Sequence, residues 1–107
     1  MSTPSPVRYH GRCIYVDGEM TIYTCGALKP RLLDELAAHP EAIQIDLSHV
    51  VELDTAGLQL LLTARRFASE AGRELSVTNP SRVVADVLEL CRLDARLAPA
   101  VDAPAET

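Results

Sequence analysis

The residues best suited to chemistry lie in one run, Asp54-Thr55-Ala56-Gly57-Leu58, which follows an apolar strand and opens a Leu-rich helix. At a helix start, the first backbone N–H groups have no partner within the helix. The Asp54 carboxylate can accept hydrogen bonds from them and face the positive end of the helix dipole. Gly57 permits close approach, either by this domain's own backbone or by a partner. The run predicts a helix cap, and capping alone or capping with partner contact both fit it.

The sequence contains no other catalytic or metal-binding pattern. Its histidines lack HExxH or other ligand spacing, and its three cysteines lack CxxC spacing. It has no GxGxxG, P-loop or GxSxG motif. We therefore expect no enzymatic activity, no metal, no cofactor, and reduced, mostly packed thiols. The residues considered are His10, His39, His49, Cys13, Cys25 and Cys91.

The composition predicts one soluble domain. A chain of 107 residues can build one core, and 48% hydrophobic with 23% charged residues is typical of globular proteins. The formal charge of -5 opposes binding to nucleic acid, and no basic run exceeds the pair Arg65-Arg66. No apolar run approaches the roughly 20 residues that span a bilayer, and the N-terminus lacks a signal-peptide pattern. We expect a cytoplasmic protein that does not insert into a membrane.

The N-terminal part of the sequence predicts a β-hairpin. Short β-prone runs at residues 7–9 and 12–16 flank His10-Gly11. Asp17-Gly18 follows the second run and predicts a turn that ends it.

A helix is predicted within residues 24–38, because leucines recur there at spacings of three and four. His39-Pro40 predicts its end. Pro30 leaves two alternatives open. Either it marks the first turn of the helix, or it lies inside a helix that begins near Thr24.

The middle of the sequence predicts a buried strand at residues 43–47 and a helix at residues 55–71, with Gly72 just past the helix end. One polar stripe runs along this helix, and apolar residues cover the rest of its surface. So wide an apolar surface is either complete core or partly a docking surface. The stripe consists of Gln59, Thr63, Arg66 and Glu70.

Residues 74–78 predict another strand, and Asn79 and Pro80 predict the N-cap and first position of a third helix. Residues 97–101 predict a last edge strand. The order β-β-α-β-α-β-α-β predicts an α/β domain, with a mixed sheet and helices packed against it. The expected division is a flexible N-terminus at 1–5, the domain at 6–101 and a flexible tail at 102–107.

Two runs, IDLSHVVELDTAGLQLLL and GRELSVTNPSRV, together with the helix to Leu93, resemble the STAS family, which is named for sulfate transporters and anti-sigma factor antagonists. The specific part is Asp46-Leu47-Ser48 followed by the DTAGL motif. The resemblance implies a STAS-type mixed sheet and a docking and regulatory surface at the start of the Leu-rich helix. The resemblance implies that this surface is formed by Asp54, Thr55, Ala56, Gly57 and Leu58.

In partner-switching members of this family, an anti-sigma kinase phosphorylates a hydroxyl at this helix start, and the modified form loses its hold on that kinase. The phosphate adds about -1.5 to -2 charges at pH 7. The acceptor serine usually precedes the motif glycine, where this chain has Ala56. Thr55 is then the candidate acceptor, with capping as its alternative role, and Ser48 and Ser69 are weaker candidates.

The same motif resembles the STAS subunit of Mla-type phospholipid ABC transporters, in which the corresponding threonine contacts the ATPase subunit. Similar domains accompany chemotaxis proteins. The resemblance therefore implies a non-catalytic, anti-sigma factor antagonist-like regulator. Its protein partner would be an anti-sigma kinase-like ATPase, an ABC-transporter ATPase subunit or a chemotaxis protein. The alternative of a domain that passively binds a nucleotide is supported only by the helix N-terminus, which can bind a phosphate group.

Overall fold

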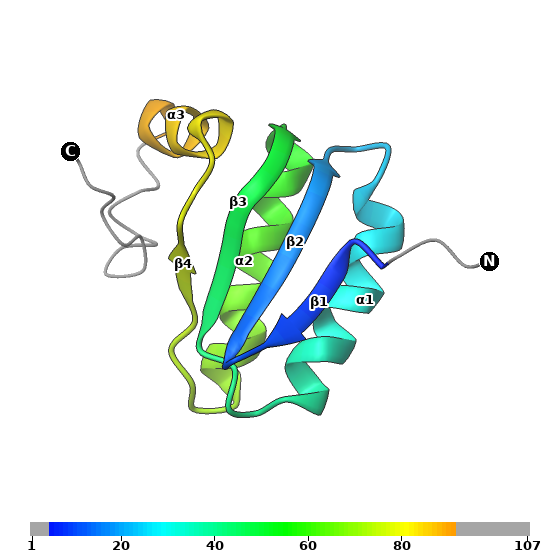
Figure 1. The fold of residues 1–107 in the computed structure, drawn as a ribbon, viewed down its shortest axis with the longest axis vertical. Helices are drawn as coiled ribbons and strands as arrows, with labels where there is room; N and C mark the ends of the chain where they lie inside the picture. Colours follow the sequence, from blue (N-terminus) through cyan, green and yellow to red (C-terminus); the bar gives the residue numbers. More distant parts are fainter. Residues whose placement is uncertain (1–4, 92–107) are drawn as a thin grey trace.

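Four strands form one sheet in the order β1-β2-β3-β4 (Figure 1). The structure is a computed structural model that describes residues 5–91. The first two strands are antiparallel, and β3 and β4 add in parallel, so the predicted mixed α/β sheet is confirmed. The predicted strand at 97–101 lies outside the described residues. The elements are β1 (Val7–His10), β2 (Cys13–Met20), α1 (Cys25–Ala38), β3 (Gln44–Leu53), α2 (Thr55–Glu70), β4 (Ser76–Thr78) and α3 (Arg82–Leu90).

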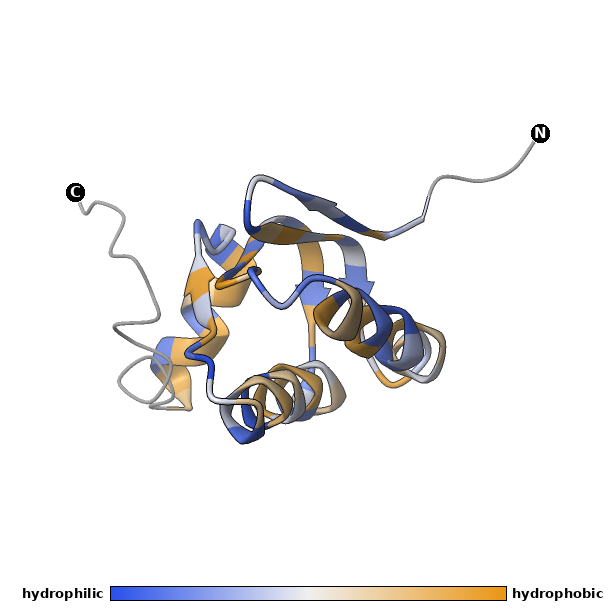
Figure 2. Cartoon of the chain, turned by 90° about the horizontal axis from the view of Figure 1, so that it is seen from below, coloured by the Kyte–Doolittle hydropathy of each residue, from blue (hydrophilic) through white to orange (hydrophobic). Residues whose placement is uncertain are grey.

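Helices α1 and α2 lie behind the sheet in Figure 1 and contact each other, while α3 packs against β3. Apolar residues occupy the central strands (Figure 2). Burying a side chain such as leucine contributes about 1.5–3 kcal/mol, so this core supplies most of the driving force for folding. The largest fully buried side chains are Ile14, Met20, Leu32, Leu36, Ile45, Leu47, Leu61, Leu88, Val16, Val50 and Val84.

The turn predicted at Asp17-Gly18 is wrong, because β2 continues through it to Met20. Gly18 has a φ of +90°, and the pairing of β2 with β3 shifts register on both sides of it. The glycine therefore serves a β-bulge, which needs the same positive φ as a turn but lets the strand continue. The extra strand length carries Met20 to the same edge of the sheet as Leu53, with which it pairs.

Helix α1 begins at Cys25 and contains Pro30, which decides between the two alternatives for this segment. Backbone N–H groups of Thr24 and Cys25 donate to the Thr21 carbonyl and start the helix before the proline. Leu28 is buried in the core, so packing holds the turn that precedes Pro30.

Strand β3 is longer than the predicted residues 43–47 and runs to Leu53. Its second half pairs with the extended end of β2, so only Asp54 separates the strand from α2. The wide apolar surface of α2 is largely core: six of its residues are buried, and Leu62 and Phe67 pack partly buried against the core.

The cap predicted at Asn79-Pro80 is also wrong, because Ser81 caps α3. Its hydroxyl oxygen accepts a hydrogen bond from the Val84 N–H at 3.3 Å, and the hydroxyl donates to the Val50 carbonyl at 2.7 Å. Asn79 instead has a φ of +47°, a left-handed conformation that asparagine tolerates better than most residues.

Arg73 joins the loop that follows α2 to the loop that follows α1. Its guanidinium donates to the carbonyls of Leu36 at 2.7 Å, His39 at 3.0 Å and Ala42 at 3.2 Å. One side chain from the α2–β4 loop thus satisfies acceptors at and after the C-terminal end of α1.

The Arg73→Met variant should lower the free energy of unfolding by about 1–3 kcal/mol, because three carbonyls lose a charged donor while an apolar stem remains. Urea unfolding measures the change. Arg31→Met, on the exposed side of α1, is the matched control. Equal unfolding midpoints for the two variants would contradict this role.

Candidate functional site

Asp54 joins two segments at the carboxyl ends of β2 and β3. It adopts the extended backbone of an N-cap, and its Oδ1 accepts a hydrogen bond from the Gly57 N–H at 3.2 Å. Its Oδ2 accepts a second bond from the Ile22 N–H at 2.9 Å. Its own N–H donates to the Met20 carbonyl at 3.2 Å. One side chain therefore caps α2 and holds the loop between β2 and α1 against it.

These hydrogen bonds also set the charge of the site. The bond from the Ile22 N–H is the main cause that lowers the pKa of Asp54, and the bonds from Gly57 and Ala56 lower it further, against a smaller opposing effect of burial. The carboxylate is therefore held in its ionised form at the positive end of α2.

Gly57 is required for close packing inside the domain. A Cβ at this position would overlap the Met20 carbonyl oxygen and the Leu53 side chain. Leu58 is buried in the core as well. Of the five residues predicted to form a site, these two thus position the helix, and their side chains do not lie on its surface.

Thr55 is the exposed member of the motif, whereas Asp54 and Ala56 are half-buried. Asp54 provides the side-chain cap of α2, so capping does not account for the Thr55 hydroxyl. Ser48, a weaker candidate acceptor, donates to Asp46 at 2.6 Å, and Ser69 is exposed near the far end of α2.

The loop between β2 and α1 carries two exposed apolar side chains that the sequence analysis missed. Ile22 is 70% exposed and Tyr23 is 92% exposed. The loop around them is closely hydrogen-bonded: Thr21 N–H donates to Thr24 Oγ1 at 2.9 Å, and that hydroxyl donates to the Glu19 carbonyl at 2.8 Å. Large apolar residues on so constrained a loop are typical of binding surfaces.

Comparison with known proteins places this geometry in a family. The model of the family described as "Mlab, STAS domain" matches residues 7–99, which is most of the chain. The chain belongs to the STAS family. No curated protein matches the sequence.

Solved structures share the fold of this STAS domain. An anti-sigma factor antagonist from Mycobacterium paratuberculosis is 25% identical with a TM-score of 0.74, and the match covers 92% of this chain and 83% of that one. The anti-sigma factor antagonist SpoIIAA in its unphosphorylated form is 17% identical with a TM-score of 0.66, covering 94% and 87%. The Bacillus cell fate determinant SpoIIAA in its phosphorylated form is 16% identical with a TM-score of 0.62, covering 94% and 90%.

Asp46, in the other motif that carries the family resemblance, has a structural role in this STAS domain. Its Oδ1 accepts from the Ser48 N–H at 2.9 Å and from the Ser48 hydroxyl at 2.6 Å, while its Oδ2 accepts from the Asn79 amide at 3.0 Å. Burial raises the pKa of Asp46, but the hydrogen bonds from Ser48 and Asn79 outweigh it, so the pKa is lowered. This network links β3 to the segment that leads into α3.

Within residues 5–91 of this STAS domain, no helix is long and apolar enough to cross a membrane. No cluster of three or more His, Cys, Asp or Glu side chains within the same residues has the arrangement of a metal site.

The Asp54→Ala variant should lower the free energy of unfolding by about 0.5–2 kcal/mol, the usual effect of removing an N-cap. The Ile22 N–H should also exchange faster with solvent, because it loses its acceptor. Thermal unfolding and amide hydrogen exchange measure the two effects. An unchanged melt with unchanged exchange at Ile22 would contradict the double role of Asp54.

Acid should weaken the Asp46 network. Since folding lowers the pKa of this carboxyl below its ordinary value of 3.8, the ionised group stabilises the fold above pH 3.8. That contribution is lost as the pH falls through the lower pKa of the folded state. The Asn79→Gly variant keeps the positive φ and removes one donor, so its stability should depend less on pH below 3.8. Parallel pH profiles of urea unfolding for the two proteins would contradict this.

Proposed function

We propose that this STAS domain is a non-catalytic regulator, similar to anti-sigma factor antagonists, which binds a protein partner at the carboxyl ends of β2 and β3. The docking surface consists of Ile22, Tyr23, Asp54 and Thr55. One observation carries the proposal: the Asp54 carboxylate accepts hydrogen bonds from both the Gly57 and the Ile22 N–H groups. The exposed hydroxyl and the exposed apolar pair therefore belong to one ordered surface.

The chemistry of this surface suits protein binding. Ile22 and Tyr23 offer apolar area that a partner can remove from water, and tyrosine is enriched among the residues that dominate binding energy. The hydrogen bonds of the Thr21–Thr24 loop order this segment before binding, so less conformational entropy is lost in the complex.

Phosphorylation of Thr55 is the proposed switch of this surface. The residue is exposed at the first position of α2, and Ala56 leaves it as the hydroxyl of the motif. A phosphate there would stand beside the ionised Asp54, which already accepts hydrogen bonds from nearby N–H groups. The added negative charge would repel a partner carboxylate and oppose burial of the neighbouring apolar pair.

The relatives support an anti-sigma kinase-like ATPase as the partner. Two of the similar structures are described as anti-sigma factor antagonists, and SpoIIAA is known in unphosphorylated and phosphorylated forms. At these levels of identity, the likeness carries the fold, so the partner is part of our proposal.

The family description favours one second candidate. Because the matching family is described as "Mlab, STAS domain", the same docking surface also suits the ATPase subunit of an ABC transporter. This partner would meet the same exposed threonine, so the two candidates differ in the partner rather than in the site.

The Thr55→Glu variant should abolish partner binding while leaving the thermal melt nearly unchanged, because an exposed carboxylate adds charge to the surface but disturbs no core packing. The tagged chain is recovered from its native host, and bound proteins are identified by mass spectrometry. Thr63→Glu, a half-buried site two turns further along α2, is the control for a charge on the same helix.

Recovery of a histidine-kinase-like ATPase with wild type and Thr63→Glu but not with Thr55→Glu would support partner switching. An ABC ATPase in the same pattern would support the transporter candidate. Equal recovery of the partner by the Thr55→Glu variant would contradict the proposed docking surface.

A further inference from the structure

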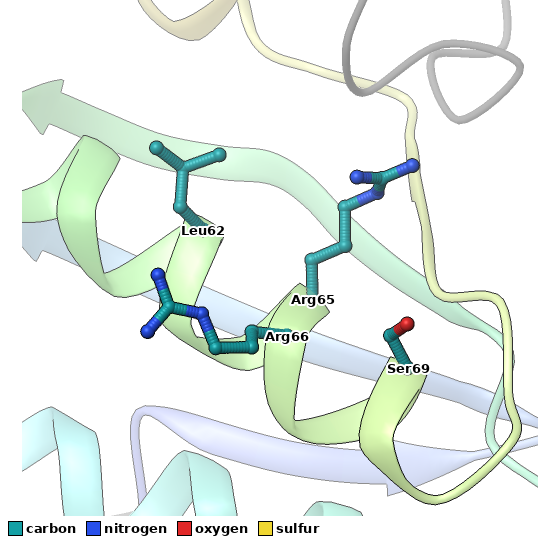
Figure 3. Close-up of a pocket in the computed structure, with 4 residues that line it drawn as sticks. All are labelled: Leu62, Arg65, Arg66 and Ser69. Carbon is teal, nitrogen blue, oxygen red and sulfur yellow. The ribbon is translucent and has the colours of Figure 1, made fainter.

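A second surface feature lies on the outer side of α2, away from the docking surface. Leu62, Arg65, Arg66 and Ser69 line a shallow cavity of about 260 Å³ (Figure 3). Their spacing of three, one and three residues places them along one side of the helix. Thr55 lies ten residues before Arg65, which is about 15 Å along a helix. A ligand in this cavity would therefore occupy a different site from the partner.

The cavity continues toward β4. A smaller hollow of about 120 Å³ shares Arg65 and Ser69 with the first and is also lined by Arg73, Glu74 and Leu75. Three guanidinium groups and one carboxylate thus line the two hollows together. We call the four residues Leu62, Arg65, Arg66 and Ser69 the arginine cavity.

The two arginines of the cavity are not held by ion pairs within residues 5–91. Arg8 pairs with Asp17 and Arg82 pairs with Asp86, but neither Arg65 nor Arg66 forms an ion pair with a described residue. Arg73 bonds to neutral carbonyls and keeps its charge.

Neighbouring groups on α2 do not explain the pair. Glu70 lies four residues after Arg66 but forms no ion pair with it. Stabilisation of the helix dipole requires cations in the last turn, and the last turn of α2 contains no basic residue. Neither an ion pair with Glu70 nor the helix dipole therefore accounts for the two arginines.

We propose that the arginine cavity binds the terminal phosphate of a phosphate monoester. Guanidinium groups recognise phosphate through several parallel N–H donors, and the Ser69 hydroxyl adds another donor. A phosphate offers three strong acceptor oxygens, which suits this set better than the two oxygens of a carboxylate. The volume lies below the roughly 300–1,000 Å³ of sites that enclose drug-sized ligands, so only the phosphate group is held there.

Side-chain movement is part of this binding mode. Figure 3 shows Arg65 extending away from α2 toward the segment of β4, whereas Arg66 lies along α2 in the direction of Leu62. Arg66 is exposed, so its side chain can change rotamer and close on a phosphate beside Arg65. The Nε–H signals of both arginines should therefore report occupancy.

The test titrates the full chain with inorganic phosphate and with glycerol 3-phosphate at constant ionic strength, while NMR follows the arginine Nε–H and backbone amide signals. Saturable shifts should appear at Arg65, Arg66 and Ser69. The Arg65→Gln/Arg66→Gln variant should weaken binding by about tenfold or more. Glutamine preserves helix propensity, so circular dichroism should stay unchanged. Arg31→Gln is the matched control and should bind like wild type.

A second arm distinguishes the source of the phosphate. Phosphatidylcholine vesicles that contain phosphatidic acid present the same monoester on a membrane. Vesicle binding that the double variant loses, without saturable shifts from soluble phosphates, would assign the site to a lipid headgroup, whereas saturable shifts from glycerol 3-phosphate would assign it to a soluble ligand. The absence of saturable binding in both arms, or equal binding of acetate, would overturn the proposal. This outcome is independent of the partner-binding test.

Discussion

The Asp54 carboxylate is the interaction on which the upper edge of this domain depends. It accepts hydrogen bonds from the Gly57 N–H at the start of α2 and from the Ile22 N–H in the loop between β2 and α1, so it joins the helix start to a residue 32 positions before Asp54 in the chain. Gly57 allows α2 to lie against the Met20 carbonyl, where a Cβ would overlap it. The cap and the glycine thus fix the helix start, and the exposed residues take their positions from them.

Polar side chains also fix the loops at the opposite end of the sheet from Asp54. There, Arg73 donates hydrogen bonds to three carbonyls and joins the loops that follow α1 and α2. Between β3 and α3, Asp46 accepts hydrogen bonds from Ser48 and Asn79. Buried leucines provide most of the stability, but these three polar side chains determine where the loops lie. The surfaces proposed for partner and phosphate binding are built on loops and a helix fixed in this way.

Periodicity predicted the elements well, because burial of leucine and valine follows the periods of helix and strand. It failed where one residue type serves two structures. Gly18 fits a turn and a bulge equally, and Asn79 fits a cap as well as the left-handed backbone that brings its amide to Asp46. The cap at Asp54 follows from local sequence, whereas its bond to Ile22 depends on strand pairing. Ile22 and Tyr23 were missed because exposed and buried apolar residues look alike in a sequence.

The central claim is that Asp54 organises the surface where a partner binds. A photo-crosslinking amino acid in place of Tyr23, expressed in the native host, tests it most directly, with the same replacement at Leu90 as a comparison, because Leu90 is 83% exposed at the end of α3. The account predicts one specific adduct from position 23, weakened when Asp54 is replaced by alanine, and none from position 90. Adducts from position 90 alone, or an adduct at position 23 that does not depend on Asp54, would contradict it.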